Sequence, residues 1–228
     1  MRKRLNLILA IAVFLSVGAG LYSNIMEQKA LDKSKLPQKV VEERMFQRWL
    51  TNLKNKGVAM EAQDFKLKEE NEIYNTTWMT VKSVDDPTEK ALYDKTLEEN
   101  TGIPKVVFNP NGRVFVDFRN TDRGSILSNQ VRLYGLKEDK IIDARVFDCS
   151  LRANCYFDRG YFLDNDVFVV TEFSRNIDKK DQTAPICLST DTCTYTIKLH
   201  LVDLVHNKRD VYESKPFDVI LSDLIPEL

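Results

Sequence analysis

An uncharged and mostly apolar run, residues 5–22, follows directly behind the three basic residues Arg2, Lys3 and Arg4. A short basic segment before an apolar stretch is typical of a secretory signal peptide or of an N-terminal membrane anchor. Either one removes residues 1–23 from the folded body. Either one also predicts that the remaining chain lies outside the cytoplasm, in a periplasmic or cell-surface location.

The segment itself leaves two interpretations open. Its densest apolar part, residues 7–17, has the length of a signal-peptide core, and Val17 and Ala19 are suitable residues before a cleavage site. The whole uncharged run is close to the lower limit of about 17 residues for a membrane-spanning helix. In a retained anchor, Tyr22 would lie at the membrane interface, where aromatic rings are enriched. Cleavage and anchoring both remain possible from the sequence.

The charge of the exported part argues against some partners. All 34 acidic residues of the chain lie after residue 23, whereas three of the 33 basic residues precede it, so residues 24–228 carry a net charge of −4. A nucleic-acid-binding domain needs a basic face. We therefore expect no nucleic-acid partner.

The exported part divides into three regions by residue pattern. Residues 24–36 are polar and are predicted to be a linker, and residues 37–104 are predicted to form a helix–strand–helix region. Pro37 suits the first position of a helix, and Gly57 suits the position after its end. An apolar stripe follows this predicted helix at helical spacing: Val41, Met45, Trp49 and Leu53, with Phe46 and Leu50 beside them. The stripe either packs on the domain's own sheet or binds a partner helix.

The rest of the helix–strand–helix region contains a strand signal and a helix start. Residues 72–84 alternate β-branched or aromatic residues with polar ones, which predicts a strand. Asp86 is a suitable N-cap, with Pro87 at the first helical position and Glu89 at the third. This second helix is expected to end near Asn100.

Residues 105–228 have the pattern of an antiparallel β domain. Short apolar runs are separated by polar turns, among them 109–112, 137–139, 164–166 and 206–209. The clearest alternation predicts a strand with Tyr195, Ile197, Leu199 and Leu201 on one face. The order of apolar runs and polar turns is similar in the two halves of this region. This similarity predicts two antiparallel meanders stacked as a sandwich or an open barrel. The expected fold class is α+β and β-rich.

The four cysteines form two identical spacings. Cys149 and Cys155 frame five residues, and so do Cys187 and Cys193. In an exported chain the simplest interpretation is two local disulfide bonds. The alternatives are crossed pairing between the two loops and a four-thiolate zinc site, although zinc sites usually have two to four residues between paired cysteines.

The two histidines are not part of a recognisable catalytic motif. His200 falls on the polar phase of a strand, expected to face solvent, and His206 falls in a turn; no nucleophile elbow or zinc-protease motif accompanies them. The sequence therefore predicts no catalytic, cofactor-binding or metal-ligating residue and no cofactor. Asp164-Asn165-Asp166 is interpreted as a turn, with a calcium site as the alternative.

Two weaker patterns suggest sites. Asp148, Asp158 and Asp164 would supply a carboxylate pair for glycoside chemistry if the fold brought them together. Four aromatic side chains either line a ligand groove or belong to the core: Tyr74, Trp78, Tyr156 and Tyr161.

The sequence favours a non-enzymatic binding or accessory module of a cell envelope. A tethered domain without an assembled catalytic motif acts most simply by contact, so an envelope or membrane protein is the expected partner. The membrane itself is a further contact, through residues 5–22, if that segment is not cleaved. The alternatives are a hydrolase that acts on envelope glycans or peptides through acidic residues, and a carrier of a small ligand or lipid.

Overall fold

The computed structural model describes residues 33–73, 79–123, 126–149, 154–175 and 187–225. The chain divides into two units, Met1–Ser34 and Lys35–Leu228, and the second unit is the folded body described below. The predictions for residues 1–23 and for most of the linker lie outside the described residues. No helix within the described ranges combines the length and the apolar character that crossing a membrane requires.

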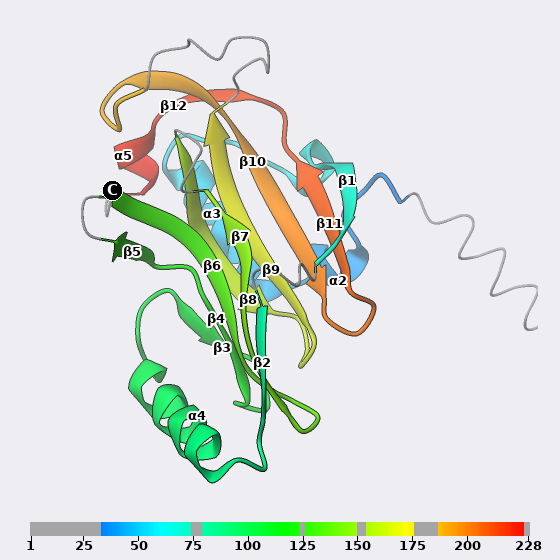
Figure 1. The fold of residues 1–228 in the computed structure, drawn as a ribbon. Coiled ribbons are helices and arrows are strands. Elements are labelled where there is room, and N and C mark those ends of the chain that lie inside the picture. Colours follow the sequence, from blue (N-terminus) through cyan, green and yellow to red (C-terminus); the bar gives the residue numbers. More distant parts are fainter. Residues whose placement is uncertain (1–32, 74–78, 124–125, 150–153, 176–186, 226–228) are drawn as a thin grey trace, which may run out of the picture. The chain divides into compact units, whose positions relative to one another are not determined.

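The body contains two antiparallel β-sheets, which we call sheet A and sheet B (Figure 1). Sheet A has the order β1 (Lys66–Glu72), β11 (Lys208–Glu213), β10 (Thr192–Asp203), β9 (Val167–Arg175) and β8 (Cys155–Phe162), with β12 (Phe217–Ile220) paired to β10. Sheet B has the order β2 (Met79–Ser83), β7 (Lys140–Asp148), β6 (Ile126–Lys137), β4 (Val114–Asp117) and β3 (Val106–Phe108), with β5 (Asn120–Arg123) paired to β6. The fold is thus β-rich, as predicted, and its sheets remain separate and open rather than closing into a barrel.

Three hydrophobic clusters define the layers of the body. The cluster between the sheets joins side chains of β4, β6 and β7 to side chains of β8, β9 and β10. A second cluster joins the opposite face of sheet A to the N-terminal helices, and a third, smaller one joins the outer face of sheet B to a later helix. Both sheets are therefore covered on both faces, at least in part, and the order of layers is helix, sheet A, sheet B, helix.

Because both faces of sheet A are covered, strand β10 contributes buried side chains to both of its faces. Tyr195, Ile197 and Leu199 belong to the helix-side cluster, whereas Val202 belongs to the cluster between the sheets. The prediction that His200 faces solvent is therefore wrong. Sheet B covers that face of β10, and His200 is only 5% exposed.

The predicted first helix forms as two helices, α2 (Gln38–Val41) and α3 (Arg44–Asn55). Glu43 lies between them in an extended conformation, and its side chain accepts a hydrogen bond from the backbone N–H of Met45. Four of the six residues of the predicted stripe are buried, and Val41 and Met45 at its N-terminal end are not. The buried side chains of α3 are Phe46, Trp49, Leu50 and Leu53, and Met45 is 45% exposed. The stripe packs on the body's own sheet, sheet A.

The second helix, α4 (Pro87–Asn100), matches its prediction closely. Asp86 caps it by accepting hydrogen bonds from the backbone N–H groups of Thr88 and Glu89. Tyr93 is its buried side chain, and it stacks near Tyr134 of sheet B at a ring-centroid distance of 6.2 Å. Two short elements complete the body, the 3-10 turn η1 (Ala62–Asp64) and helix α5 (Leu221–Leu224).

The segment before residue 105 supplies an edge strand to each sheet. β1 pairs with β11, and β2 pairs with β7. β1 has the sequence KLKEENE, whose charges hide any alternation, so the sequence pattern assigns no strand there. Charged side chains on an edge strand discourage pairing with other chains. Part of the strand predicted over residues 72–84 is observed as β2, and residues 74–78 lie outside the described part.

Candidate functional site at the loop end of the sandwich

Four turns meet at one end of the two sheets. They join β3 to β4, β6 to β7, β8 to β9 and β10 to β11, and residues of all four surround one cavity. Turns that project from a rigid pair of sheets are a common place for binding residues, because they vary freely while the strands hold their bases fixed.

Asn109 fastens the β3–β4 turn of sheet B to the β8–β9 turn of sheet A. Its carboxamide oxygen accepts hydrogen bonds from the backbone N–H groups of Arg113 and Val114, at 3.0 and 3.1 Å. Its amide nitrogen donates to the backbone oxygen of Asn165, at 3.0 Å, and the Asn165 side chain accepts from the backbone N–H of Asn111, at 3.0 Å. Asn109 is 4% exposed. The turn predicted at residues 109–112 is thus present and cross-linked to the turn predicted at 164–166.

The cavity, which we call the loop-end pocket, has a volume of about 490 Å³ and opens to solvent. Sites for small molecules are typically about 300–1,000 Å³. Its lining combines apolar, amide and charged side chains: Asn109, Asn111, Arg113, Val114, Leu133, Gly135, Leu136, Lys137, Glu138, Ile142, Asn165, Asp166, Leu204 and Val205. A mixed lining of this kind suits a small ligand with both apolar and polar parts.

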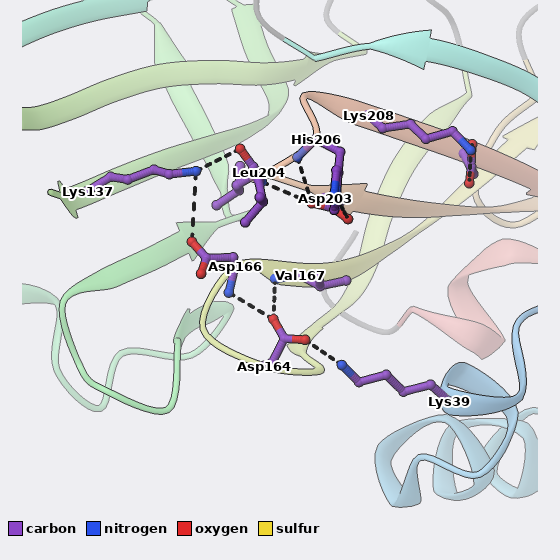
Figure 2. A network of polar contacts seen from close by, with 11 residues as sticks. Lys39, Lys137, Asp164, Asp166, Val167, Asp203, Leu204, His206 and Lys208 are labelled. Carbon is purple, nitrogen blue, oxygen red and sulfur yellow. Dashed lines mark hydrogen bonds and ion pairs between the residues drawn. The ribbon is translucent and has the colours of Figure 1, made fainter. Parts of the chain in front are cut away.

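The pocket is lined by two basic residues, of which Lys137 already has polar partners and Arg113 is exposed. Lys137 donates a hydrogen bond to the backbone oxygen of Leu204, at 2.7 Å, and its Nζ lies 3.9 Å from Asp166 Oδ1, as Figure 2 shows. Arg113 is exposed, and within the described ranges no carboxylate forms an ion pair with its guanidinium. Arg113 is therefore the cation that remains available for a ligand.

The rim of the pocket is held by a second set of polar contacts. Asp164 accepts hydrogen bonds from the backbone N–H groups of Asp166 and Val167, at 2.9 and 2.8 Å, and pairs with Lys39 of α2 (Figure 2). Burial alone raises the pKa of Asp164, but the bonds from Lys39 and from the backbone outweigh it and lower this pKa. Residues 164–166 thus form the predicted turn. Lys39 pairs with the Asp164 carboxylate, which a calcium ion at this turn would need as a ligand.

His206 lies in its predicted turn on the same rim. Its Nδ1 lies 2.8 Å from Asp203 Oδ2, and the other oxygen of Asp203 accepts from the backbone N–H groups of Val205 and His206 (Figure 2). These hydrogen bonds lower the pKa of Asp203, although burial by itself raises it. The contact holds Val205, which is 61% exposed, at the mouth of the pocket.

The three aspartates proposed for carboxylate chemistry each have different partners. Asp148 Oδ2 lies 3.1 Å from an Nη atom of Arg145. Asp158 accepts a hydrogen bond from the indole N–H of Trp49, at 2.9 Å, and Asp164 pairs with a lysine of α2. Burial raises the pKa of Asp158. The structure does not bring the three together as a carboxylate pair.

The aromatic candidates divide between the core and the part outside the described residues. Tyr161 is buried in the cluster between sheet A and the helices, and Tyr156 packs against the same cluster. They are core residues rather than the lining of a groove. Tyr74 and Trp78 lie outside the described residues.

The four cysteines form the two predicted local disulfides. Cys149 is bonded to Cys155 and Cys187 to Cys193, with Cα–Cα distances of 5.5 and 6.5 Å. No cysteine is free, so crossed pairing and a four-thiolate site do not form in this structure. Two disulfides are consistent with an oxidising, extracytoplasmic location.

A buried polar cluster lies beside the first disulfide and was missed by sequence reasoning. Glu172 of β9 is 1% exposed, and it contacts Ser174, Lys198 and His200. Its Oε2 lies 2.9 Å from His200 Nε2, and its Oε1 accepts a hydrogen bond from Ser174. We call these four residues the Glu172 cluster. The available signal was a single acidic residue within the apolar run of β9, VFVVTEF, because a buried charge marks a special site.

We expect the Glu172 cluster to make the body sensitive to acid. Burial lowers the pKa of His200, and this effect outweighs the attraction of Glu172. The unfolded chain, with an ordinary histidine pKa of about 6.5, takes up the proton first, so the free energy of unfolding falls as the pH drops below about 6.5. Urea unfolding of wild type and His200→Gln between pH 7.5 and 5 would measure the fall.

His200→Gln should flatten this part of the pH profile. Equal slopes in wild type and His200→Gln would contradict the assignment.

Comparison of the chain with protein-family models, with curated proteins and with solved structures finds no match.

Proposed function

We propose that this protein is a non-enzymatic, extracytoplasmic binding module that holds a small ligand in its loop-end pocket. The observation that carries the proposal is the pocket itself, which is built from four turns. Asn109 and Asn165 fasten two of these turns together, and Lys137 links the other two. Because the strands and these hydrogen bonds fix the turns in advance, little conformational entropy is lost when a ligand binds.

The chemistry of the lining indicates the class of ligand. Arg113 offers a planar cation that suits a carboxylate or a phosphate group. Asn111 and Asn165 offer amide groups for further hydrogen bonds, and Leu136 and Val205 offer apolar surface. The ligand that fits this lining is a small molecule with one anionic group and an apolar part.

Two independent features support the proposed location. The two disulfides favour an oxidising compartment, and the basic and apolar N-terminus favours export or anchoring. A module tethered through residues 5–22 would search for partners only along a membrane surface. Within the proposal, the module serves as an accessory subunit of an envelope complex and presents or senses its ligand there.

Replacing Arg113 tests the proposal. A panel of small carboxylates and phosphates, each with its neutral amide or ester, is screened for binding to the full chain by ligand-observed NMR. We expect anionic members to bind, and Arg113→Ala to weaken binding by at least about tenfold, because a hydrogen bond to a charged group contributes about 1.5–3 kcal/mol.

The control is Arg48→Ala, which removes the same charge from an exposed position of α3 that does not line the pocket. Arg48→Ala should bind as wild type does. Equal affinity of wild type and Arg113→Ala, or preference for the neutral members of the panel, would contradict the proposed ligand class.

A further inference from the structure

The first disulfide lies directly against the Glu172 cluster. The Sγ atoms of Cys149 and Cys155 and a carboxylate oxygen of Glu172 all lie within 4.8 Å of one another, and all three residues are buried. A carboxylate costs free energy in an interior unless it is paired. Once reduced to thiolates, the two sulfurs and one carboxylate oxygen are donor atoms that bind zinc in proteins.

Hydrogen bonds hold the backbones of Cys149 and Cys155 in place independently of the S–S bond. The backbone N–H of Cys149 donates to the backbone oxygen of Asn129, at 2.9 Å, and the Asn129 side chain donates to the backbone oxygen of Cys155, at 2.8 Å. Cys155 also lies opposite Ser174 in the pairing of β8 with β9, and Ser174 donates to Glu172. The two sulfurs therefore stay near Glu172 when the bond between them is broken.

We propose that the reduced chain binds a thiophilic divalent cation, such as Zn²⁺, through the thiolates of Cys149 and Cys155 and the carboxylate of Glu172. A dithiol reductant supplies two electrons and two protons to the S–S bond and becomes a disulfide itself. The cation then displaces the proton of each thiol, and both protons pass to the solvent. Chains made in a reducing compartment carry these cysteines as thiols before any disulfide forms.

The exchange leaves the charge of the interior unchanged. A disulfide is neutral, and so is a divalent cation with two thiolates. Glu172 keeps its contact with Lys198, whose Nζ lies 4.0 Å from its Oε1, in both forms. No additional charge is buried when the metal replaces the S–S bond, so the large penalty for an unpaired interior charge does not arise.

The two sulfurs, which are bonded to each other in the oxidised chain, separate on reduction, and His200 already contacts Glu172. Two donors on one zinc ion, each about 2.0–2.3 Å from it, lie at most about 4.6 Å apart. The three donors here are within 4.8 Å. His200 contacts Oε2 of Glu172 and orients the carboxylate, as outer residues do in metal sites. Three protein ligands leave a fourth tetrahedral position for water.

The second disulfide provides a matched control. Cys187 Sγ lies 3.5 Å from the backbone oxygen of Leu188 and 3.8 Å from that of Asp191. Among the residues that the structure describes, no carboxylate or imidazole gathers around Cys187 and Cys193 to complete a comparable donor set. Both disulfides close a loop of five residues, so the two cysteine pairs differ in the groups near their sulfurs and not in loop length.

The test uses the full chain, reduced with a phosphine and titrated with Co²⁺ under anaerobic conditions. We expect one equivalent of Co²⁺ to give thiolate-to-cobalt charge-transfer absorption. Cys187→Ser/Cys193→Ser should keep this absorption, Cys149→Ser/Cys155→Ser should lose it, and Glu172→Gln should weaken binding at least tenfold. Zn²⁺ should also protect Cys149 and Cys155 of the unmutated chain from alkylation, as read by mass spectrometry, while Cys187 and Cys193 react.

The alkylation measurement needs no variant, so it decides the matter even where a substitution prevents folding. Absence of thiolate-bound Co²⁺ in the reduced chain overturns the proposal. So does protection by Zn²⁺ of the second cysteine pair instead of the first, or binding that Glu172→Gln leaves at full strength.

Discussion

Gly135→Ala is expected to destabilise the body by more than about 3 kcal/mol, because the new methyl group has no space. A Cβ atom at this position of β6 would lie 2.4 Å from Cα of Val114 and 2.5 Å from the backbone oxygen of Arg113. Both obstacles are backbone atoms, one in the first residue of β4 and one in the residue before it, and β4 pairs with β6 at this point. Relief of the clash therefore requires the two strands to move apart, beside the loop-end pocket.

Urea unfolding followed by circular dichroism would measure the effect of Gly135→Ala. Gly102→Ala is the control: no atom lies within 4 Å of the added Cβ, and only its positive φ of 77° opposes the change. A left-handed conformation costs a non-glycine residue about 1–2 kcal/mol. If Gly135→Ala destabilised the body no more than Gly102→Ala does, the close approach of β4 and β6 would be wrong.

Phe46→Ala is expected to cost about 3–5 kcal/mol, whereas Met45→Ala should cost less than about 1 kcal/mol. Phe46 is fully buried between α3 and sheet A, and its ring lies 6.0 Å from that of Trp49 and 6.1 Å from that of Phe65. Met45, its neighbour in the chain, is 45% exposed. Alanine is favourable for the helix at both positions, so the difference reports packing alone.

Parallel urea titrations of the two variants would measure this difference. Similar losses at positions 45 and 46 would show that α3 does not pack as described. A larger loss for Met45→Ala would favour the stripe of a continuous helix from Pro37 to Gly57. Phe46→Leu, with an intermediate loss, keeps the comparison measurable if Phe46→Ala fails to fold.

Local chemistry made several features predictable. Asp86 caps α4 because its short carboxylate reaches two N–H groups of the same turn, and that contact needs only neighbouring residues. The turn at 109–112 and the hairpin turn at 164–166 follow from residues that favour tight turns. The two disulfides also pair locally, across loops of five residues.

Other features depended on what covers each face. His200 was expected in solvent because alternation separates the two faces of β10 but does not say that sheet B covers the second one. β1 was missed because its charges hide the strand pattern, and its partner β11 lies far away in the chain. Glu172 was missed because nothing local shows that Ser174 and His200 would satisfy a buried carboxylate.

The sequence by itself determined the β-rich class, most of the turns and the cap of α4, and it favoured the local cysteine pairs, because each depends on residues within a few positions of one another. The stacking of the two sheets, the convergence of four turns on the loop-end pocket and the place of Glu172 beside Cys149 and Cys155 were decided by tertiary structure. These features join residues far apart in the chain, and local residue patterns carry no information about which distant strands will face each other.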